Sequence, residues 1–478
     1  MRVLLVGNNY FALHADRDKG LIALGGLESF ILNYAECMLE RGHSIAIAAT
    51  DDSTFSLFED KYGDRFQFIP LGGPSRSLNN DRFSYKNYER FCESLTKKEY
   101  GDFDFVLNNN TASSVVIRGL LNECLTHGTI ILTVMHREST RMGSYIIGAQ
   151  IAEAIKKSNG RYMLVANSEF TRNNWKQFTD SAVVNLGTKP YPGKVTPRSS
   201  NFGKGLFIGR ISPEKAPHVP IMAAINRYKP KEPQLWEDLH NVPLIEADVM
   251  QVEELIPLEL IGNTTRAPKI VADYCDGWEN FYKSVDDKVK WHGHMPYDQH
   301  IKLQAEENVY LVHSTIMLES FGLITAEGMS VGVPSVLRDK GNLPYFVNKG
   351  DVIEENRYFK ATTTGVLVYS GRLGDMEYVQ GFRKAMQWLS QNMDKYPRDF
   401  LIQHHAEHYS MDVMLDNYIA LVADIDAGKV VVDDRTRRVK MTPKGEEAYY
   451  AEIPFPQVFW ERNAAITEGS SPVINESV

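Results

Sequence analysis

Short apolar runs alternate with helical patterns along most of this 478-residue chain, and they do so in two series. The strands predicted in the first series are Arg2–Val6, Ser44–Ala49, Phe66–Ile69, Phe103–Leu107, Thr129–Met135 and Tyr162–Ala166, and helices are predicted over Leu27–Arg41 and Ile146–Ser158. The strands predicted in the second series are Leu206–Ile208, Leu258–Ile261, Val289–Trp291, Val309–Val312, Ser335–Leu337 and Gly365–Val368. Strands separated by helices form a parallel sheet with helices on both faces. The fold class is therefore predicted as α/β, with two doubly wound, Rossmann-like domains that face a central cleft.

The boundary between the two series is a stretch rich in Pro, Gly and Ser, from Lys189 to Gly205, which is typical of a linker. We predict an N-terminal domain over residues 1–192, a C-terminal domain over 205–410, and an extension over 429–478 whose end is expected to be disordered. A helix at about 411–428 is expected to complete the N-terminal domain. Residues 229–256 form an acidic, proline-bearing insertion to which the sequence assigns no role.

Charge and composition restrict the class of protein. The net charge of −9 argues against a generally basic nucleic-acid binder. It is unevenly distributed, because residues 1–200 have a balance of +2 and the remainder a balance of −11. No apolar run reaches the length of a membrane span, and the first strand is too short for a signal peptide. The four cysteines lack metal-ligand spacing, so we expect reduced thiols in a cytoplasmic protein.

The segment 317–344 carries the strongest functional signal. Glu319 and Glu327 are separated by seven residues, and a Ser-Phe-Gly turn follows the first of them. The apolar pattern predicts a helix that begins after Gly322, with Glu327 about one turn inside it. The amides of Phe321, Gly322 and Leu323 would be free donors at the positive end of that helix, which favours phosphate. Such a site suits a ligand with phosphates between two hydroxyl-rich ends, as in a nucleotide sugar.

Three further motifs fall at strand ends or at the start of a helix. Gly25-Gly26-Leu27-Glu28 precedes a helix, where glycine lets the backbone approach a phosphate or sugar closely. Gly209-Arg210 and Lys215 follow the first strand of the second series, where two cations suit a diphosphate. His136 follows a predicted strand and would face the ligand crevice. His292, His294 and His313 are interpreted as structural or base-lining, and His404 and His405 as surface residues.

Taken together, these pieces resemble the retaining GT-B glycosyltransferases of glycosyltransferase family four. The family's two acids seven residues apart match Glu319 and Glu327, and its Gly-Arg…Lys element matches Gly209, Arg210 and Lys215. Its early Gly-Gly loop matches Gly25 and Gly26. The resemblance covers the two-domain layout and is most specific at 317–344. The chain differs from the family at Gly341-Asn342, where the family often has Gly-Gly, and at the insertion 229–256.

The resemblance implies a role for each matching residue. The expected catalytic residues are Glu319, which would hold donor-sugar hydroxyls, Arg210 and Lys215, which would neutralise the departing diphosphate, and His136, near the transferred sugar. Glu327 would bind the ribose hydroxyls. The other expected donor-binding residues are Gly25, Gly26, Phe321, Gly322, Leu323 and His294, and the acceptor-side candidates are Glu28, Arg137 and Arg141.

No Asp-x-Asp segment is recognisable as a metal motif, and no carboxylate is clearly placed as a covalent nucleophile. We therefore expect metal-independent transfer with retention, without a cofactor, from a nucleotide sugar such as UDP-glucose to a hydroxyl-bearing acceptor. The acceptor would be a saccharide, a lipid-linked sugar or a small molecule. One alternative is transfer to hydroxymethylated DNA, as in phage enzymes of this fold, with Arg76, Arg82, Lys86, Arg137 and Arg141 as candidate DNA contacts. Two others are a nucleotide-sugar epimerase and a non-catalytic nucleotide-sugar-binding protein.

Overall fold

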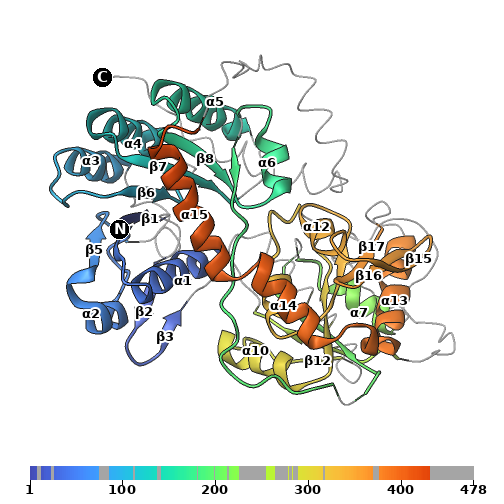
Figure 1. Ribbon diagram of the computed structural model, residues 1–478. Coiled ribbons are helices and arrows are strands. Elements are labelled where there is room, and N and C mark those ends of the chain that lie inside the picture. Colours follow the sequence, from blue (N-terminus) through green and yellow to red (C-terminus); the bar gives the residue numbers. More distant parts are fainter. Residues whose placement is uncertain are drawn as a thin grey trace, which may run out of the picture.

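The computed structural model describes residues 1–430 except 8–11, 23–25, 75–84, 111–113, 137–141, 180, 199, 213–214, 226–254, 264–277, 279–281, 284–288, 316–317 and 370–375. Two α/β domains lie side by side (Figure 1), each built on a mainly parallel sheet. The α/β fold class predicted from the alternating pattern is confirmed. Residues 229–254 of the insertion and the end of the chain after residue 430 lie outside the described residues.

The N-terminal sheet has the strand order β5-β4-β1-β6-β7-β8-β9, and each described pairing within it is parallel. Its strands are β1 (Arg2–Val6), β4 (Ser44–Ala49), β5 (Phe66–Pro70), β6 (Phe105–Asn108), β7 (Ile130–Met135), β8 (Tyr162–Ala166) and β9 (Ala182–Val183). The helices are α1 (Gly26–Glu40), α2 (Ser56–Tyr62), α3 (Tyr85–Thr96), α4 (Ser114–His127), α5 (Met142–Lys157) and α6 (Glu169–Trp175). A small hairpin, β2 (His14–Asp16) and β3 (Gly20–Ile22), stands apart from the sheet. The central strands are fully buried, as expected when helices cover both faces.

The C-terminal sheet has the order β12-β11-β10-β13-β14-β17-β16-β15 and becomes antiparallel at β16 and β15. Its strands are β10 (Lys204–Ile208), β11 (Leu258–Ile261), β12 (Lys290–Trp291), β13 (Val309–His313), β14 (Ser335–Arg338), β15 (Val352–Glu355), β16 (Phe359–Thr362) and β17 (Gly365–Val368). The helices are α7 (His218–Ile225), α10 (Tyr297–Glu306), α11 (Leu323–Ser330), α12 (Leu343–Val347), α13 (Met376–Gln391) and α14 (Arg398–His408). The order reverses between the neighbours β10 and β13, and such switch points position ligand sites at the carboxyl ends of strands.

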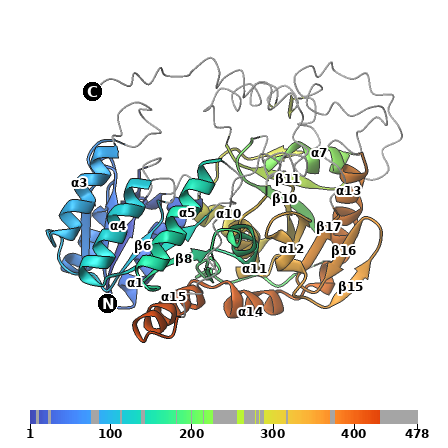
Figure 2. The ribbon, with the colours of Figure 1, turned by 90° about the horizontal axis from the view of Figure 1, so that it is seen from above.

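The last described helix, α15 (Met411–Asp426), leaves the C-terminal domain and lies along the N-terminal one (Figures 1 and 2). Arg41, just after α1, holds it by bonds of 2.6 Å to both Asp412 and Asp416. Tyr34 of α1 and Tyr418 of α15 meet edge to face in the buried core. Burial of this apolar contact stabilises the association of the returning helix with the N-terminal domain.

The chain crosses between the domains at two points that are bonded to each other. The Thr188 amide donates to the Tyr409 carbonyl at 2.9 Å, and the Met411 amide donates to the Thr188 carbonyl at 3.0 Å. The Thr188 hydroxyl lies 2.8 Å from Nε2 of His405, which is 2% exposed. The prediction that His405 lies at the surface is therefore wrong, because its helix packs against the crossing strand.

Candidate active site

Glu319 lies in the loop between β13 and α11, at the carboxyl edge of the second sheet. One carboxylate oxygen lies 2.7 Å from Nζ of Lys215 and 3.4 Å from Nε2 of His313. Burial alone would raise the pKa of Glu319, but Lys215 and His313 more than offset this and hold the pKa well below its ordinary value. Glu319 is therefore ionised at neutral pH, in contact with a lysine expected to bind the diphosphate.

The Glu319 backbone is held by the loop after β14. The Asn342 amide donates to the Glu319 carbonyl at 2.7 Å, and the Asn342 side chain donates to the Phe321 carbonyl at 3.0 Å. Gly341 has φ +63°, and a Cβ there would come within 2.5 Å of backbone atoms of Glu319. A glycine is therefore required at the first position of this loop, whereas Asn342 provides a side-chain contact that a second glycine would lack.

Helix α11 begins directly after this loop, as the sequence predicts. Its N-cap, Gly322, has φ +106°, and Glu327 lies in the second turn. Among the described residues, no acceptor takes the amide protons of Phe321, Gly322 or Leu323. Three backbone donors at the start of a helix form a site suited to an anion.

The N-terminal domain also holds the start of α11. The Ser168 hydroxyl, at the N-cap of α6, donates to the Ser320 carbonyl. A Cβ on Gly26, the first residue of α1, would lie 3.1 Å from Cδ1 of Leu323. The start of α11 is thus placed between the two domains, next to Gly26.

Glu327, on α11, has a partly buried side chain. Among the described side chains none bonds to its carboxylate, and burial raises its pKa to about 7. Tyr297 of α10 is close enough that, in addition to burial, Glu327 raises the pKa of its phenol. A buried carboxyl without a protein partner is costly unless a ligand supplies hydrogen-bond donors, and this is consistent with the expected ribose contact.

The loop after β10 presents the two predicted cations differently. The Gly209 amide donates to the Ile261 carbonyl at 3.0 Å and the Ile211 amide to the Asn263 carbonyl at 2.9 Å, so the loop backbone is fixed to the end of β11. Arg210 between them is exposed, whereas Lys215 is half-buried against Glu319. Lys215 is therefore part of the Glu319 cluster, and Arg210 lies on the solvent-facing side of the same loop.

The N-terminal wall contributes His136, which follows β7. Its Nε2 lies 2.9 Å from the Asn109 side-chain oxygen, and its ring meets Phe30 of α1 edge to face. Glu28 is 3% exposed, in the first turn of α1. The predicted residues Gly25, Arg137 and Arg141 lie outside the described part of the chain, as do Arg76 and Arg82.

The structure assigns the other strand-end histidines to different environments. His313, at the end of β13, lies against Glu319, a contact that the sequence analysis missed although both residues flank the same sheet edge. His292 lies 2.8 Å from Glu259 within a cluster that includes Lys204, a structural ion-pair network. His294 is exposed in the loop before α10. Among the residues that the structure describes, no group of three or more His, Cys, Asp or Glu side chains is arranged to hold a metal ion.

The two-domain fold, with a helix start and Lys215 at the carboxyl edge of the second sheet, is the architecture of the GT-B class of glycosyltransferases. Residues 283–362, which include β12, β13, Glu319, Glu327 and the loop after β14, match the family model described as "Glycosyl transferases group 1". The enzyme class expected from the sequence is confirmed by this match together with the fold. No curated protein sequence matches the chain, and no described helix is long and apolar enough to cross a membrane.

Solved structures show the same fold at low sequence identity. HepE of Anabaena, solved in complex with UDP and glucose, has 14% identity and a TM-score of 0.56, covering 88% of this chain and 99% of its own. A glycosyltransferase from Rickettsia africae has 16% identity and a TM-score of 0.58, covering 89% and 98%. Sucrose-phosphate synthase of Thermosynechococcus elongatus has 12% identity and a TM-score of 0.59, covering 89% and 99%. At these identities the likeness establishes the fold.

Proposed function

We propose that this enzyme transfers a hexose-like sugar, with retention and without a metal, from a nucleotide-diphosphate sugar to a hydroxyl-bearing acceptor. The observation that carries the proposal is the contact of Glu319 with Lys215, beside the free amides at the start of α11. A carboxylate and a cation held together at an anion-binding helix start suit a substrate that joins a sugar to a diphosphate. The UDP and glucose bound to HepE support a UDP-sugar as the donor.

The diphosphate would lie against the amides of Phe321 to Leu323, with Lys215 on one side and Arg210 approaching from solvent. The bond between the anomeric carbon and the diphosphate breaks as negative charge develops on the leaving oxygen. Preorganised cations and amides stabilise that charge more in the transition state than in the ground state. Lys215 is already fixed by Glu319, so little reorganisation is needed when the donor binds.

Glu319 would accept hydrogen bonds from donor-sugar hydroxyls and stabilise the positive charge that develops on the ring. Its strongly lowered pKa keeps it ionised for both tasks. We propose that the acceptor hydroxyl enters from the side of the departing diphosphate and gives its proton to the leaving oxygen, which preserves the anomeric configuration. His136, on the N-terminal wall, would contact the transferred sugar, and closure of the domains would exclude water.

Glu327, one helical turn further along α11, would hold the ribose hydroxyls. The buried carboxyl has acceptor capacity and no protein donor within the described structure. The loop containing His294, just before Tyr297, would line the base. These assignments divide the donor among three parts of the site, with the sugar at Glu319, the diphosphate at Lys215 and the ribose at Glu327.

The proposal is tested by incubating the enzyme with α-configured UDP-glucose and a panel of hydroxyl acceptors, and by determining the product's anomeric configuration by NMR. We expect an α-linked product from the wild type and a loss of about a hundredfold or more in kcat for Glu319→Gln. The matched control, Glu306→Gln on the exposed side of α10, should transfer normally. A β-linked product would refute retention, and normal turnover by Glu319→Gln would refute the sugar-site assignment.

A further inference from the structure

A second pocket lies between α13 and the hairpin β15–β16, in the C-terminal domain. It has a volume of about 250 Å³ and is open to solvent. Both views of the ribbon place these elements at the end of the molecule remote from the N-terminal domain (Figures 1 and 2). The residues that line it are Glu354, Asn356, Tyr358, Phe359, Lys384, Gln387, Trp388 and Gln391. None of them belongs to the site around Glu319.

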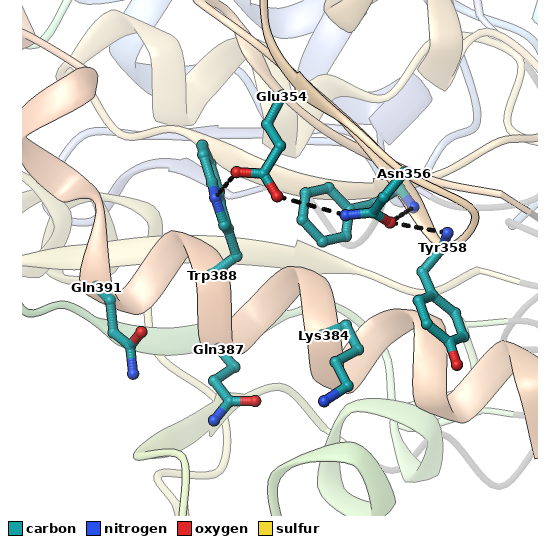
Figure 3. Close-up of a pocket in the computed structure, with 8 residues that line it drawn as sticks. Glu354, Asn356, Tyr358, Lys384, Gln387, Trp388 and Gln391 are labelled. Atoms are coloured by element: carbon teal, nitrogen blue, oxygen red, sulfur yellow. Dashed lines mark hydrogen bonds between the residues drawn. The ribbon is translucent and has the colours of Figure 1, made fainter.

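The upper wall of this pocket is organised by hydrogen bonds among its own residues (Figure 3). The Trp388 indole donates to one Glu354 oxygen at 2.5 Å, and the Asn356 amide donates to the other at 3.4 Å. The Asn356 oxygen in turn accepts from the backbone amides of Tyr358 and Phe359 at 2.9 and 3.2 Å. The carboxylate and the amide therefore have fixed orientations before any ligand arrives, which lowers the entropy cost of binding.

The opposite wall is one face of α13. Lys384, Gln387 and Gln391 are spaced three and four residues apart, so that they lie along the same side of the helix. Figure 3 shows their side chains extending side by side from α13, below the Trp388 ring. Each glutamine offers two donor protons and an acceptor oxygen, and among the described residues neither amide has a partner.

The chemistry of the lining favours a neutral, hydroxyl-rich ligand. Among the lining residues one carboxylate and one ammonium cancel, and the neighbouring cations Arg357 and Lys395 lie against the Tyr358 and Trp388 rings, at 4.4 and 5.1 Å from the ring centroids. Three amides and a carboxylate match hydroxyl groups, which both donate and accept, and the Tyr358 and Trp388 rings supply the apolar surface against which the C–H face of a sugar packs. The volume is that of a small ligand or of one unit of a larger one.

We propose that this pocket is a second, non-catalytic carbohydrate site that binds one neutral sugar unit of an oligosaccharide. The pocket would act as an anchor that holds a glycan acceptor on the enzyme while another sugar unit of the same glycan enters the cleft. This anchoring role rests on the proposed function. The binding itself does not rest on it, because the pocket is separate from the donor site. Occupation of the pocket would raise the local concentration of the acceptor end of the same glycan near the cleft.

Binding is tested with three neutral trisaccharides (maltotriose, cellotriose and mannotriose) by isothermal titration of the enzyme saturated with UDP, which fills the donor site; a variant of the pocket separates binding in the pocket from binding of the glycan in the cleft. Quenching of tryptophan fluorescence reports on Trp388 in the same titration. We expect at least one trisaccharide to bind the wild type and the double variant Gln387→Ala/Gln391→Ala to bind it about tenfold or more weakly. Gln403→Ala, an exposed glutamine of α14 that bonds Glu407, is the matched control and should bind like the wild type.

The proposal is overturned if none of the three trisaccharides binds at millimolar concentration, or if the double variant binds as tightly as the wild type. The anchoring role has its own readout, a KM for a trisaccharide acceptor that rises in the double variant while kcat stays unchanged. An unchanged KM refutes the anchor. Because binding is measured without turnover, failure of the transfer reaction would leave the titration result standing, so the two proposals fail independently.

Discussion

Replacing Glu327 by glutamine should stabilise the ligand-free enzyme while weakening donor binding. Burial raises the pKa of this carboxyl from an ordinary 4.5 to about 7 in the folded protein. Between these two values the native state holds a proton that the unfolded chain has lost, so the contribution of Glu327 to stability falls as the pH rises from about 4.5 to about 7. Above pH 7 the folded protein carries a buried carboxylate, and glutamine removes that cost.

The magnitude follows from the difference in proton affinity. A pKa of about 7 instead of 4.5 corresponds to a full cost of about 3 kcal/mol, at about 1.4 kcal/mol for each tenfold change. Because the side chain keeps some contact with solvent, we expect Glu327→Gln to be more stable than the wild type by about 1–3 kcal/mol at pH 8, with a smaller advantage at pH 5. The same variant should bind UDP-glucose about tenfold more weakly, since glutamine accepts fewer hydrogen bonds from the ribose.

Urea unfolding at pH 5 and pH 8 measures the difference in free energy of unfolding between variant and wild type, and titration calorimetry measures donor affinity. Glu306→Gln, whose carboxylate is exposed, controls for the general effect of removing a charge and should show no such pH dependence. Burial of the Glu327 carboxyl is refuted as the cause if the stability advantage of Glu327→Gln over the wild type is the same at both pH values, or if the wild type is more stable than the variant at pH 8.

Three other predictions concern contacts that fix the site and the domain crossing. Lys215→Met removes the cation that holds Glu319, and kcat for transfer should fall about a hundredfold or more; a fall below threefold in a radiolabel assay would contradict it. Arg398 is 7% exposed and donates to backbone carbonyls at the ends of α10 and α11. Arg398→Met should therefore lower the free energy of unfolding, measured with urea, by about 3 kcal/mol. An unchanged free energy of unfolding would contradict this. Thr188→Val removes the bond to His405, a histidine that is neutral at pH 7 because burial lowers its pKa to about 4. We expect the variant to lose about 1–2 kcal/mol of stability and to bind UDP with unchanged affinity. A changed UDP affinity would show that the contact does more than stabilise the fold.

The sequence alone predicted the framework well where the apolar pattern was strong. The predicted strands Arg2–Val6, Ser44–Ala49 and Leu258–Ile261 have the observed bounds, because buried parallel strands are continuous apolar runs between turns. The short strands β15, which is half-exposed, and β16, which is mostly buried, were not predicted. They form the antiparallel edge of the sheet, where alternation over four residues is too short to distinguish from a loop.

The residues of the site were predicted from the sequence, but the contacts between them were not. Glu319, Lys215 and the start of α11 were identified from the sequence, but the ion pair between the first two joins residues 104 positions apart. That contact depends on β10 and β13 being neighbours in the sheet, which local patterns do not encode. His313 was assigned a structural or base-lining role for the same reason. The prediction for His405 was wrong because Thr188, which bonds to it, is 217 positions away in the sequence.

The central claim is that the start of α11 and Lys215 bind a nucleotide-diphosphate sugar, and thermal unfolding with a panel of nucleotides and nucleotide sugars tests it most directly. A ligand that binds only the folded state raises stability by mass action, by about 2.7 kcal/mol at a hundred times its Kd. We predict a rise in Tm with UDP-sugars in the wild type, and a much smaller rise at the same concentrations in Lys215→Met. If no nucleotide or nucleotide sugar shifts the Tm of the wild type, the donor site proposed at Glu319, Lys215 and α11 is contradicted.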